Sequence, residues 1–156
     1  MKEKSKFSLT RYKDERVVEL VKITDHKILA VWAIDCVLRV LPYFKEKFPE
    51  DTRPRNAIEV LREWINTGVF KMEKILKASL ESHAAAREVE EDSSARSSAR
   101  AAGQAVATAH IPTHSIAAAI YALQAIYRDP SILEAEAAIA QERDWQYKHL
   151  IKLRKK

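Results

Sequence analysis

The segment VWAIDCVLRVLP, residues 31–42, is apolar at almost every position, yet it carries Asp35 and Arg39. An apolar stripe this broad is typical of a helix that is buried on most of its sides, where an isolated charge is costly. Asp35 and Arg39 are four residues apart, which places them on one helical face and favours a pair between them. We therefore predict a buried ion-pair network. The alternative partners for Asp35 are the arginines of the following helix, Arg53, Arg55 and Arg62.

The low glycine content argues for helices on both sides of this segment. The chain of 156 residues has two glycines and five prolines, which leaves little chemistry for the tight turns that sheets need. With 47% hydrophobic and 31% charged residues, the composition is that of a globular domain. We predict one all-α domain over residues 1–156, a compact bundle or stack of about six to seven antiparallel helices around a central apolar helix at residues 25–48. Residues 1–24 are expected to be a variable extension with room for a short helix.

Capping and helix-breaking residues predict where the helices begin and end. Thr24 can cap the central helix with Asp25 in its first turn, and Pro42 predicts a kink or break near residues 38–41. A helix over Arg53–Asn66 should end at Gly68, because glycine favours the left-handed conformation of a C-cap. Further helices are expected at about residues 70–91, 94–110 and 113–127, and from an Asp129–Pro130 cap to the C-terminus.

Small residues recur every four positions in one of these helices, at Ala95, Ala99, Gly103 and Ala107. A glycine inside a helix costs about 1 kcal/mol relative to alanine. A structural gain should offset this cost, and the pattern predicts a close crossing of another helix at Gly103.

The residues that could carry chemistry do not form a known catalytic pattern. In the segment HIPTH, Pro112 interrupts the helix between His110 and His114, so the two histidines lack the spacing of a helical metal pair. Cys36 is surrounded by apolar neighbours and is predicted to be a core thiol. The chain has no glycine-rich phosphate loop and no nucleophile elbow. We therefore predict that the protein is not an enzyme and has no catalytic residues, metal or cofactor.

The charge is concentrated at the two ends of the chain. The formal net charge is +5, and much of the excess lies in MKEKSK (1–6) and KHLIKLRKK (148–156). Neither segment is interleaved with the aromatic residues that stack on bases, which disfavours nucleic-acid binding. The first residues lack an apolar signal core, and the chain has no run of about 18 uncharged apolar residues. These features and the single cysteine favour a cytoplasmic protein without a membrane segment.

Several segments together resemble a known family. They are LAVWAIDCVLRVLP (29–42), RPRNAIEVLREW (53–64), ESHAAAREVEED (81–92), SARAAGQAVATAHIPTHSIAAAIYALQA (98–125) and ERDWQYKHLIKL (142–153). From about residue 25 onward the chain resembles the putative immunity protein family. Its members are small helical proteins of bacteria, with archaeal relatives, that are inferred to neutralise the toxins of polymorphic-toxin systems.

The resemblance implies a non-enzymatic interaction protein that binds and neutralises a toxin-like protein partner. Polar positions that match the family motifs are the candidate binding residues: Asp35, Arg39, Arg53, Arg55, His83, Arg100, His110 and His114. The partner could also contact the acidic stretch Glu88–Asp92 or the last helix around Trp145 and Tyr147. The oligomeric state stays open, with a homodimer that buries the last helix as one alternative.

The alternative function is a small-molecule- or metal-binding helical protein or enzyme. Its site would lie where Asp35, Arg39, Arg100, His110 and His114 converge. This convergence requires the helix of small residues around Gly103 to pack against the helix around Trp32.

Overall fold

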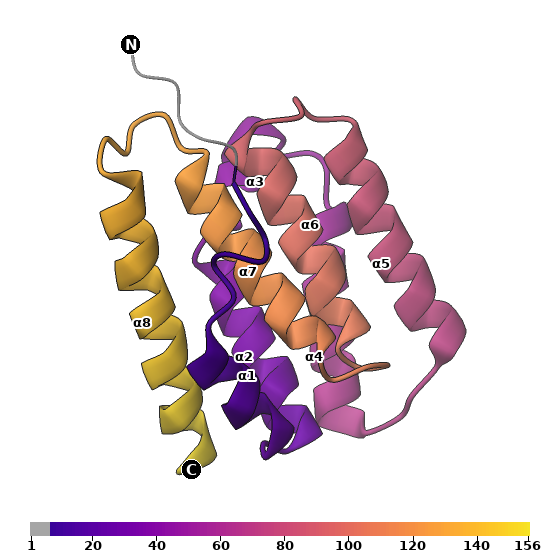
Figure 1. The fold of residues 1–156 in the computed structure, drawn as a ribbon. Helices are drawn as coiled ribbons and strands as arrows, with labels where there is room; N and C mark the ends of the chain where they lie inside the picture. The colour runs from indigo at the N-terminus through magenta and orange to yellow at the C-terminus, as the bar shows by residue number, and fades with distance from the viewer. Residues whose placement is uncertain (1–6) are drawn as a thin grey trace.

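The computed structural model describes residues 7–156, which form eight α-helices and no strand (Figure 1). They are α1 (Glu15–Lys22), α2 (His26–Leu38), α3 (Pro42–Lys47), α4 (Arg53–Thr67), α5 (Met72–Arg87), α6 (Ser94–Ala107), α7 (His114–Tyr127) and α8 (Ala135–Arg154). The predicted all-α class is confirmed. The predicted number of helices is too small, because the segment at residues 25–48 forms two helices rather than one.

The break in that segment lies where proline predicts it. α2 ends at Leu38, and Pro42 opens α3 at its first turn, where a missing N–H costs nothing. The predicted cap of α2 is wrong by one residue. Asp25 caps α2 by accepting a hydrogen bond from the Lys27 N–H, while the Thr24 hydroxyl donates to the Leu20 carbonyl of α1.

The predictions for α4 and α8 have opposite outcomes. α4 ends before Gly68, whose φ of 71° is the left-handed conformation that glycine accepts. The last helix begins at Ala135 rather than at Asp129–Pro130. The Asp129 carboxylate instead accepts hydrogen bonds from the Ser131 N–H and hydroxyl and from the Tyr43 hydroxyl. Asp129 thus stabilises the turn that follows α7 and links the α7–α8 connection to α3.

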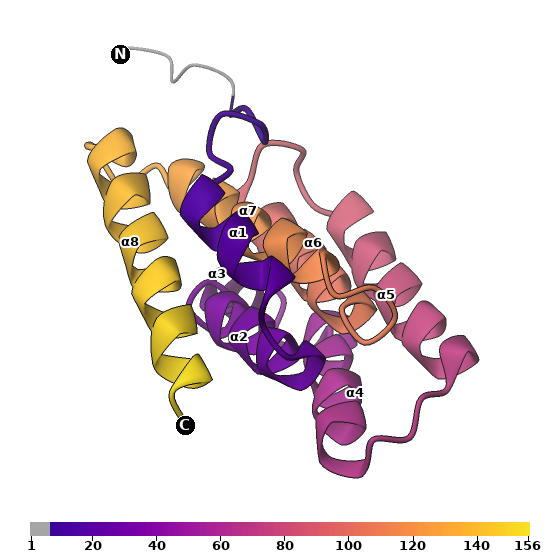
Figure 2. The same ribbon diagram turned by 60° about the horizontal axis from the view of Figure 1, so that its bottom comes forward.

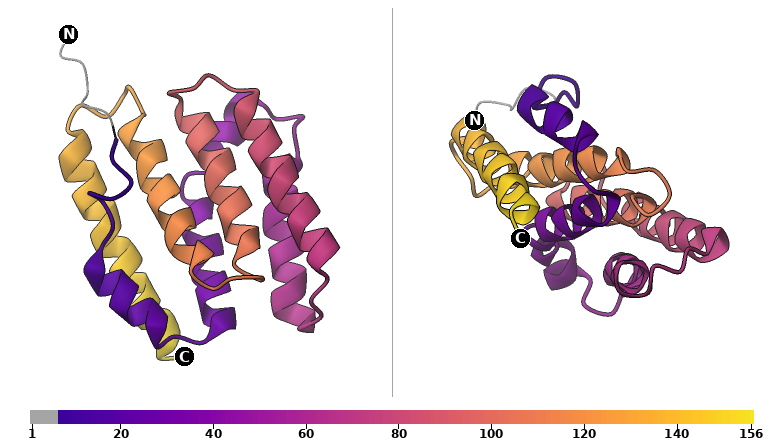
Figure 3. Two further views of the ribbon diagram at one scale, coloured as in Figure 1. Left: turned by 45° about the vertical axis from the view of Figure 1, so that its right-hand side comes forward. Right: turned by 90° about the horizontal axis from the view of Figure 1, so that it is seen from below.

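Seven of the helices described in residues 7–156 form two layers, and α1 lies outside these layers. α5, α6, α7 and α8 lie side by side in one row, and α2, α3 and α4 lie behind it (Figures 1 and 3). α1 crosses the outer side of the row, where it packs against α7 and α8 (Figure 2). α6 packs against α2, α3, α4, α5 and α7, so it shares the central place that was predicted for α2 alone.

Trp32 joins three helices in the core. Its side chain is fully buried, and its indole N–H donates to the Gln146 carbonyl of α8 at 2.9 Å. The Gln146 amide in turn donates to the Ala119 carbonyl of α7 at 3.0 Å. Cys36 on the same helix is also buried, and burial raises the pKa of its thiol well above the usual value. The prediction of a core thiol is confirmed.

Gly103 of α6 is in tight contact with the side chain of His83 on α5. A Cβ atom at this position would lie 2.7 Å from the Nε2 atom of His83 on α5. Two α5 hydroxyls also donate to α6 carbonyls, Ser79 to Gly103 at 2.9 Å and Ser82 to Ala99 at 2.7 Å. The predicted close crossing at Gly103 is confirmed, and His83 is the residue that fills the space.

We expect Gly103→Ala to destabilise the protein when His83 is present and to stabilise it when His83 is replaced. Alanine improves helix propensity by about 1 kcal/mol, but overpacking against a ring costs about 1–3 kcal/mol. Unfolding by urea of the parent, Gly103→Ala, His83→Ala and the double variant measures both terms. The close crossing is refuted if Gly103→Ala has the same effect in both backgrounds.

Candidate protein-interaction surface

The charges in the segment at residues 31–42 do not pair with each other. Arg39 holds Glu142 on α8 through two hydrogen bonds, from Nε at 2.6 Å and from Nη2 at 2.9 Å. Asp35 accepts from His149 of α8, with its Oδ2 atom 2.7 Å from Nε2. The predicted Asp35–Arg39 pair is therefore wrong, because the face that carries both residues packs against α8.

These charges are also less buried than predicted. The side chains of Asp35 and Arg39 are 33% and 43% exposed, and only Glu142, at 9%, is withdrawn from water. The Arg39 guanidinium lies 3.9 Å from the centre of the Trp145 ring, and the His149 ring stacks on the same indole. These contacts join α2 to α8 at the edge of the core.

The arginines of α4 are not the partners of Asp35 either. Arg53 pairs with Asp51 at 2.7 Å and with Glu88. Arg62 lines the same hollow as Asp35 but pairs with Glu59. Arg55 is exposed on the outer side of α4.

We expect Glu142→Gln to lower stability more than Asp35→Asn. Glutamine at position 142 keeps one neutral acceptor oxygen and places an NH2 donor against the Arg39 guanidinium, so both charge-assisted hydrogen bonds are weakened or lost, which corresponds to about 1–3 kcal/mol. Asp35 sits in a partly exposed pair, for which about 0–1 kcal/mol is typical. Chemical unfolding of both variants measures the difference, and an Asp35→Asn cost equal to or above that of Glu142→Gln would contradict the assignment of these pairs.

A second polar group lies on the outer face of the row formed by α5, α6 and α7. The Arg100 guanidinium of α6 donates to Nδ1 of His83 on α5 at 2.9 Å. His114 at the start of α7 lies with its Nδ1 atom 2.7 Å from the Gln104 side-chain oxygen, which can only accept. His110 is exposed and stacks on Phe70, with the ring centres 6.0 Å apart.

The structure therefore brings His83, Arg100, His110 and His114 to one side of the molecule and leaves the other candidate binding residues elsewhere. The alternative site that joined Asp35 and Arg39 to this group is not formed. α6 does pack against α2, as that hypothesis required, but Arg100 lies on the opposite, partly exposed face of α6. Among residues 7–156, no group of three or more His, Cys, Asp or Glu side chains is placed to hold a metal ion.

Burial and neighbouring cations keep His83 neutral. Desolvation lowers the pKa of His83 from its ordinary value near 6.5 to about 4, and the charges of Arg100, Arg87 and His114 act in the same direction. Burial also lowers the pKa of His114, with a further contribution from His110. The folded structure therefore favours the uncharged form of both imidazoles.

We expect His83 to make the protein less stable in mild acid. Between about pH 6.5 and about pH 4, the unfolded chain binds a proton at His83 that the folded chain does not. The stability from the neutral ring is therefore complete above about pH 6.5 and is lost as the pH falls towards 4. Unfolding at a series of pH values should show a smaller loss for His83→Gln than for the parent, and equal losses in the two chains would contradict the pKa shift.

An apolar ridge on α5 is the feature that the sequence prediction missed. Met72, Leu76 and Leu80 recur every four residues on its outer face, and Leu76 and Leu80 are 52% and 57% exposed. We call these three residues the α5 ridge. Val69, Phe70 and Ile111 add further exposed apolar side chains. The repeat was readable in the sequence, but the same spacing also describes a buried helix face.

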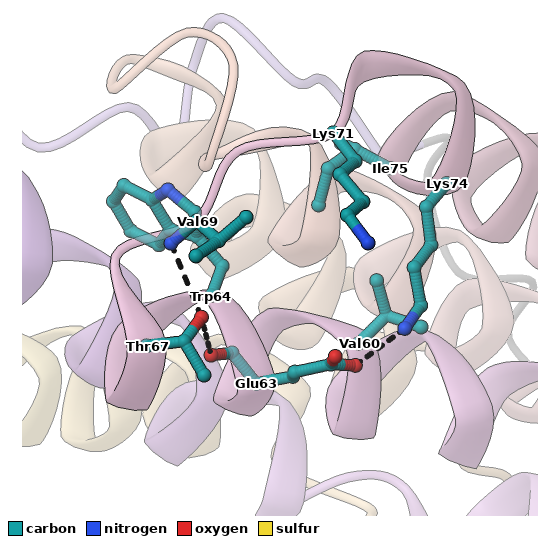
Figure 4. Close-up of a pocket in the computed structure, with 8 residues that line it drawn as sticks. All are labelled: Val60, Glu63, Trp64, Thr67, Val69, Lys71, Lys74 and Ile75. Carbon is teal, nitrogen blue, oxygen red and sulfur yellow. Dashed lines mark hydrogen bonds and ion pairs between the residues drawn. The ribbon is translucent and has the colours of Figure 1, made fainter.

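A hollow of about 150 Å³ lies between the end of α4 and the beginning of α5 (Figure 4). Its apolar walls are formed by Trp64, Val60 and Ile75. At its rim, Lys74 forms an ion pair with Glu63 at 2.5 Å. Ligand pockets for small molecules are usually about 300–1,000 Å³, so the hollow is smaller than a typical ligand pocket.

The other surfaces named as candidates make some contacts within the chain. The acidic stretch reaches Arg53 through Glu88 and approaches Arg128 through Asp92, at 3.7 Å. On α8, Trp145 is stacked by His149 and Arg39, and the Arg16 guanidinium lies 4.3 Å from the Tyr147 ring centre.

Comparison with known proteins places the chain in a family. Residues 19–153 match the family described as Imm-5 like putative immunity protein, which confirms the resemblance of the segments quoted above. No curated protein and no solved structure matches the chain. None of the helices within residues 7–156 has the length and apolar character needed to cross a membrane. The match covers most of the chain, so this protein belongs to the Imm-5 like putative immunity protein family.

Proposed function

We propose that the protein is a non-enzymatic immunity protein that binds a toxin through the α5 ridge and neutralises it. Membership of the family supports the class of function. The observation that carries the proposal is the exposure of Leu76 and Leu80 in a continuous apolar row. Contiguous exposed apolar patches on soluble proteins mark sites of protein interaction.

The surroundings of the α5 ridge have the composition of an interface. Interfaces combine an apolar centre with a polar rim. On the open outer face of α5, Leu76 and Leu80 are surrounded by the charged side chains of Glu73, Lys77, Glu81 and Arg87. The hollow at Trp64 lies near the beginning of α5 and offers space for one anchoring side chain of the partner, in the manner of a binding hot spot.

The ridge is also held on a rigid support. α5 is fixed to α6 by the contact of His83 with Gly103 and by the hydrogen bonds of Ser79 and Ser82. A surface that is ordered before binding loses little conformational entropy when the partner arrives. This favours tight binding without rearrangement of the chain.

We expect Leu76→Glu with Leu80→Glu to abolish protection against the toxin while the fold is retained. The two leucines are exposed, so their replacement should change stability by less than about 0.5 kcal/mol, whereas charges at the centre of an interface oppose binding. The measurement is growth of cells that express the toxin-like product of the neighbouring gene together with each form of this protein. Leu133→Glu is the matched control, because Leu133 is an exposed leucine in the α7–α8 connection, away from the ridge.

The outcomes separate the proposal from its alternatives. Protection by the parent and by Leu133→Glu, but not by the double variant, supports binding at the ridge. Full protection by the double variant would refute the ridge as the binding surface. If light scattering shows a dimer of the parent that the double variant splits, the ridge serves self-association and the proposal is wrong.

A further inference from the structure

Three arginines lie close to one another on the outer face of α6 and at the end of α7. Arg96 and Arg100 are two of the four partly exposed residues of α6, and Arg128 follows the end of α7. Arg96 and Arg100 are one turn apart on the same face of α6, and Arg128 reaches this helix by donating to the Ser97 hydroxyl at 3.0 Å. We call Arg96, Arg100 and Arg128 the arginine cluster.

The arginine cluster has few counter-charges. Arg100 donates to the neutral His83 ring, Arg96 to the Val89 carbonyl at 3.3 Å, and Arg128 to the Ser97 hydroxyl at 3.0 Å. Within residues 7–156, no carboxylate lies within 4.0 Å of Arg96 or Arg100. Arg128 has one, the almost fully exposed Asp92, at 3.7 Å. Most of the guanidinium N–H groups therefore have no acceptor from the described chain.

This arrangement is unfavourable for the isolated protein. Burial lowers the pKa of Arg100 and of Arg128, and the charge of Arg96 lowers both further. A lowered arginine pKa means that the folded chain disfavours the charged form. Residues that cost stability in this way are characteristic of functional surfaces.

Arg87 connects the cluster to the α5 ridge. It lies on the same outer face of α5 as Leu76 and Leu80, and its charge acts on both His83 and Arg100. Apolar side chains and unneutralised guanidinium groups thus follow one another across the surface of α5 and α6.

We propose that the arginine cluster binds the carboxylates of an acidic segment in the protein partner whose apolar residues cover the α5 ridge. The proposal rests on the proposed function in taking that partner to be a protein. Guanidinium groups bind carboxylates through two parallel hydrogen bonds, and such charge-assisted bonds are the strong ones in interfaces.

The surroundings favour an acidic protein segment over a nucleic acid. The stretch Glu88–Asp92 lies at the same end of α5 and α6, and Glu91 and Asp92 act on Arg128. These acids oppose any anion placed beside Arg128. A nucleic acid carries a phosphate at every nucleotide and would meet them along its length, whereas a protein segment can leave the position next to these acids uncharged. A segment with isolated carboxylates between apolar residues can place its charges on Arg87 and the cluster and its apolar side chains on Leu76 and Leu80.

The test uses the full chain and a short fluorescein-labelled peptide in which glutamates flank two leucines. Anisotropy titrations compare this peptide with a version in which glutamine replaces each glutamate. We expect the glutamate peptide to bind the parent, and Arg100→Gln to weaken it by about tenfold, the effect of one charge-assisted pair. Lys152→Gln, which removes an exposed cation of α8, is the charge-matched control and should leave binding unchanged. The thermal midpoint of Arg100→Gln should equal or exceed that of the parent.

Each other outcome overturns the proposal. Equal affinity for the glutamate and glutamine peptides, no binding of either, or an equal loss in Lys152→Gln would remove a specific role for the cluster. Tighter binding of single-stranded DNA than of the glutamate peptide, lost in Arg100→Gln, would assign the cluster to nucleic acid. The growth assay with the toxin-like product of the neighbouring gene distinguishes failure of the acidic-segment proposal from failure of the proposed function. If Arg100→Gln protects fully while the ridge variant does not, only the acidic-segment proposal fails. If the parent gives no protection, the proposed function fails.

Discussion

The close packing of α6 is the constraint on which the rest of the structure depends. Ten of its fourteen residues are buried, and all ten are alanine, serine, glycine or valine. Small side chains allow α2, α3, α4, α5 and α7 to approach this helix from several sides. Polar groups that enter the packed region are satisfied locally. The Ser98 hydroxyl, for example, donates to the Val40 carbonyl at 2.8 Å. The strip of α6 that no helix covers carries Arg96, Arg100 and Gln104. Among residues 7–156, neither of these arginines has a carboxylate within 4.0 Å.

This packing divides the polar residues into two groups with different physical roles. On the α2–α8 side, Arg39 meets Glu142 and Asp35 meets His149, so each charge has a partner from the neighbouring helix. On the α5–α6–α7 side, Arg100 meets only a neutral imidazole. Paired charges join α8 to α2, whereas the arginine cluster next to the exposed leucines is the surface for which we propose a complementary partner.

Local features were predictable from the sequence, and long-range partners were not. Pro42 and Gly68 act through the backbone of their own turn, and the break and the cap that they predict are present. The repeat of small residues at Gly103 predicts a close crossing, which is present, but it does not predict that His83 is the partner. The partner of Asp35 depends on which helix packs against α2, and a helical wheel contains no information on that choice. Leu76 and Leu80 repeat with the spacing of any amphipathic helix, so only the packing of Ile75 and Ala78 towards the core shows that the leucines face outward. The family match accounts for the resemblance of the quoted segments, but it does not indicate which surface of this protein binds the partner.

Hydrogen–deuterium exchange of the full chain, with and without the purified toxin-like product of the neighbouring gene, tests the location of the binding surface most directly. Slower exchange of an amide on adding the partner reports burial or stabilisation of that segment. We expect the added protection to lie in α5, in the α4–α5 connection and in the outer strip of α6, with α8 unchanged. Protection confined to α8 and α1, or none at a concentration of partner that saturates the complex, would contradict binding through the α5 ridge.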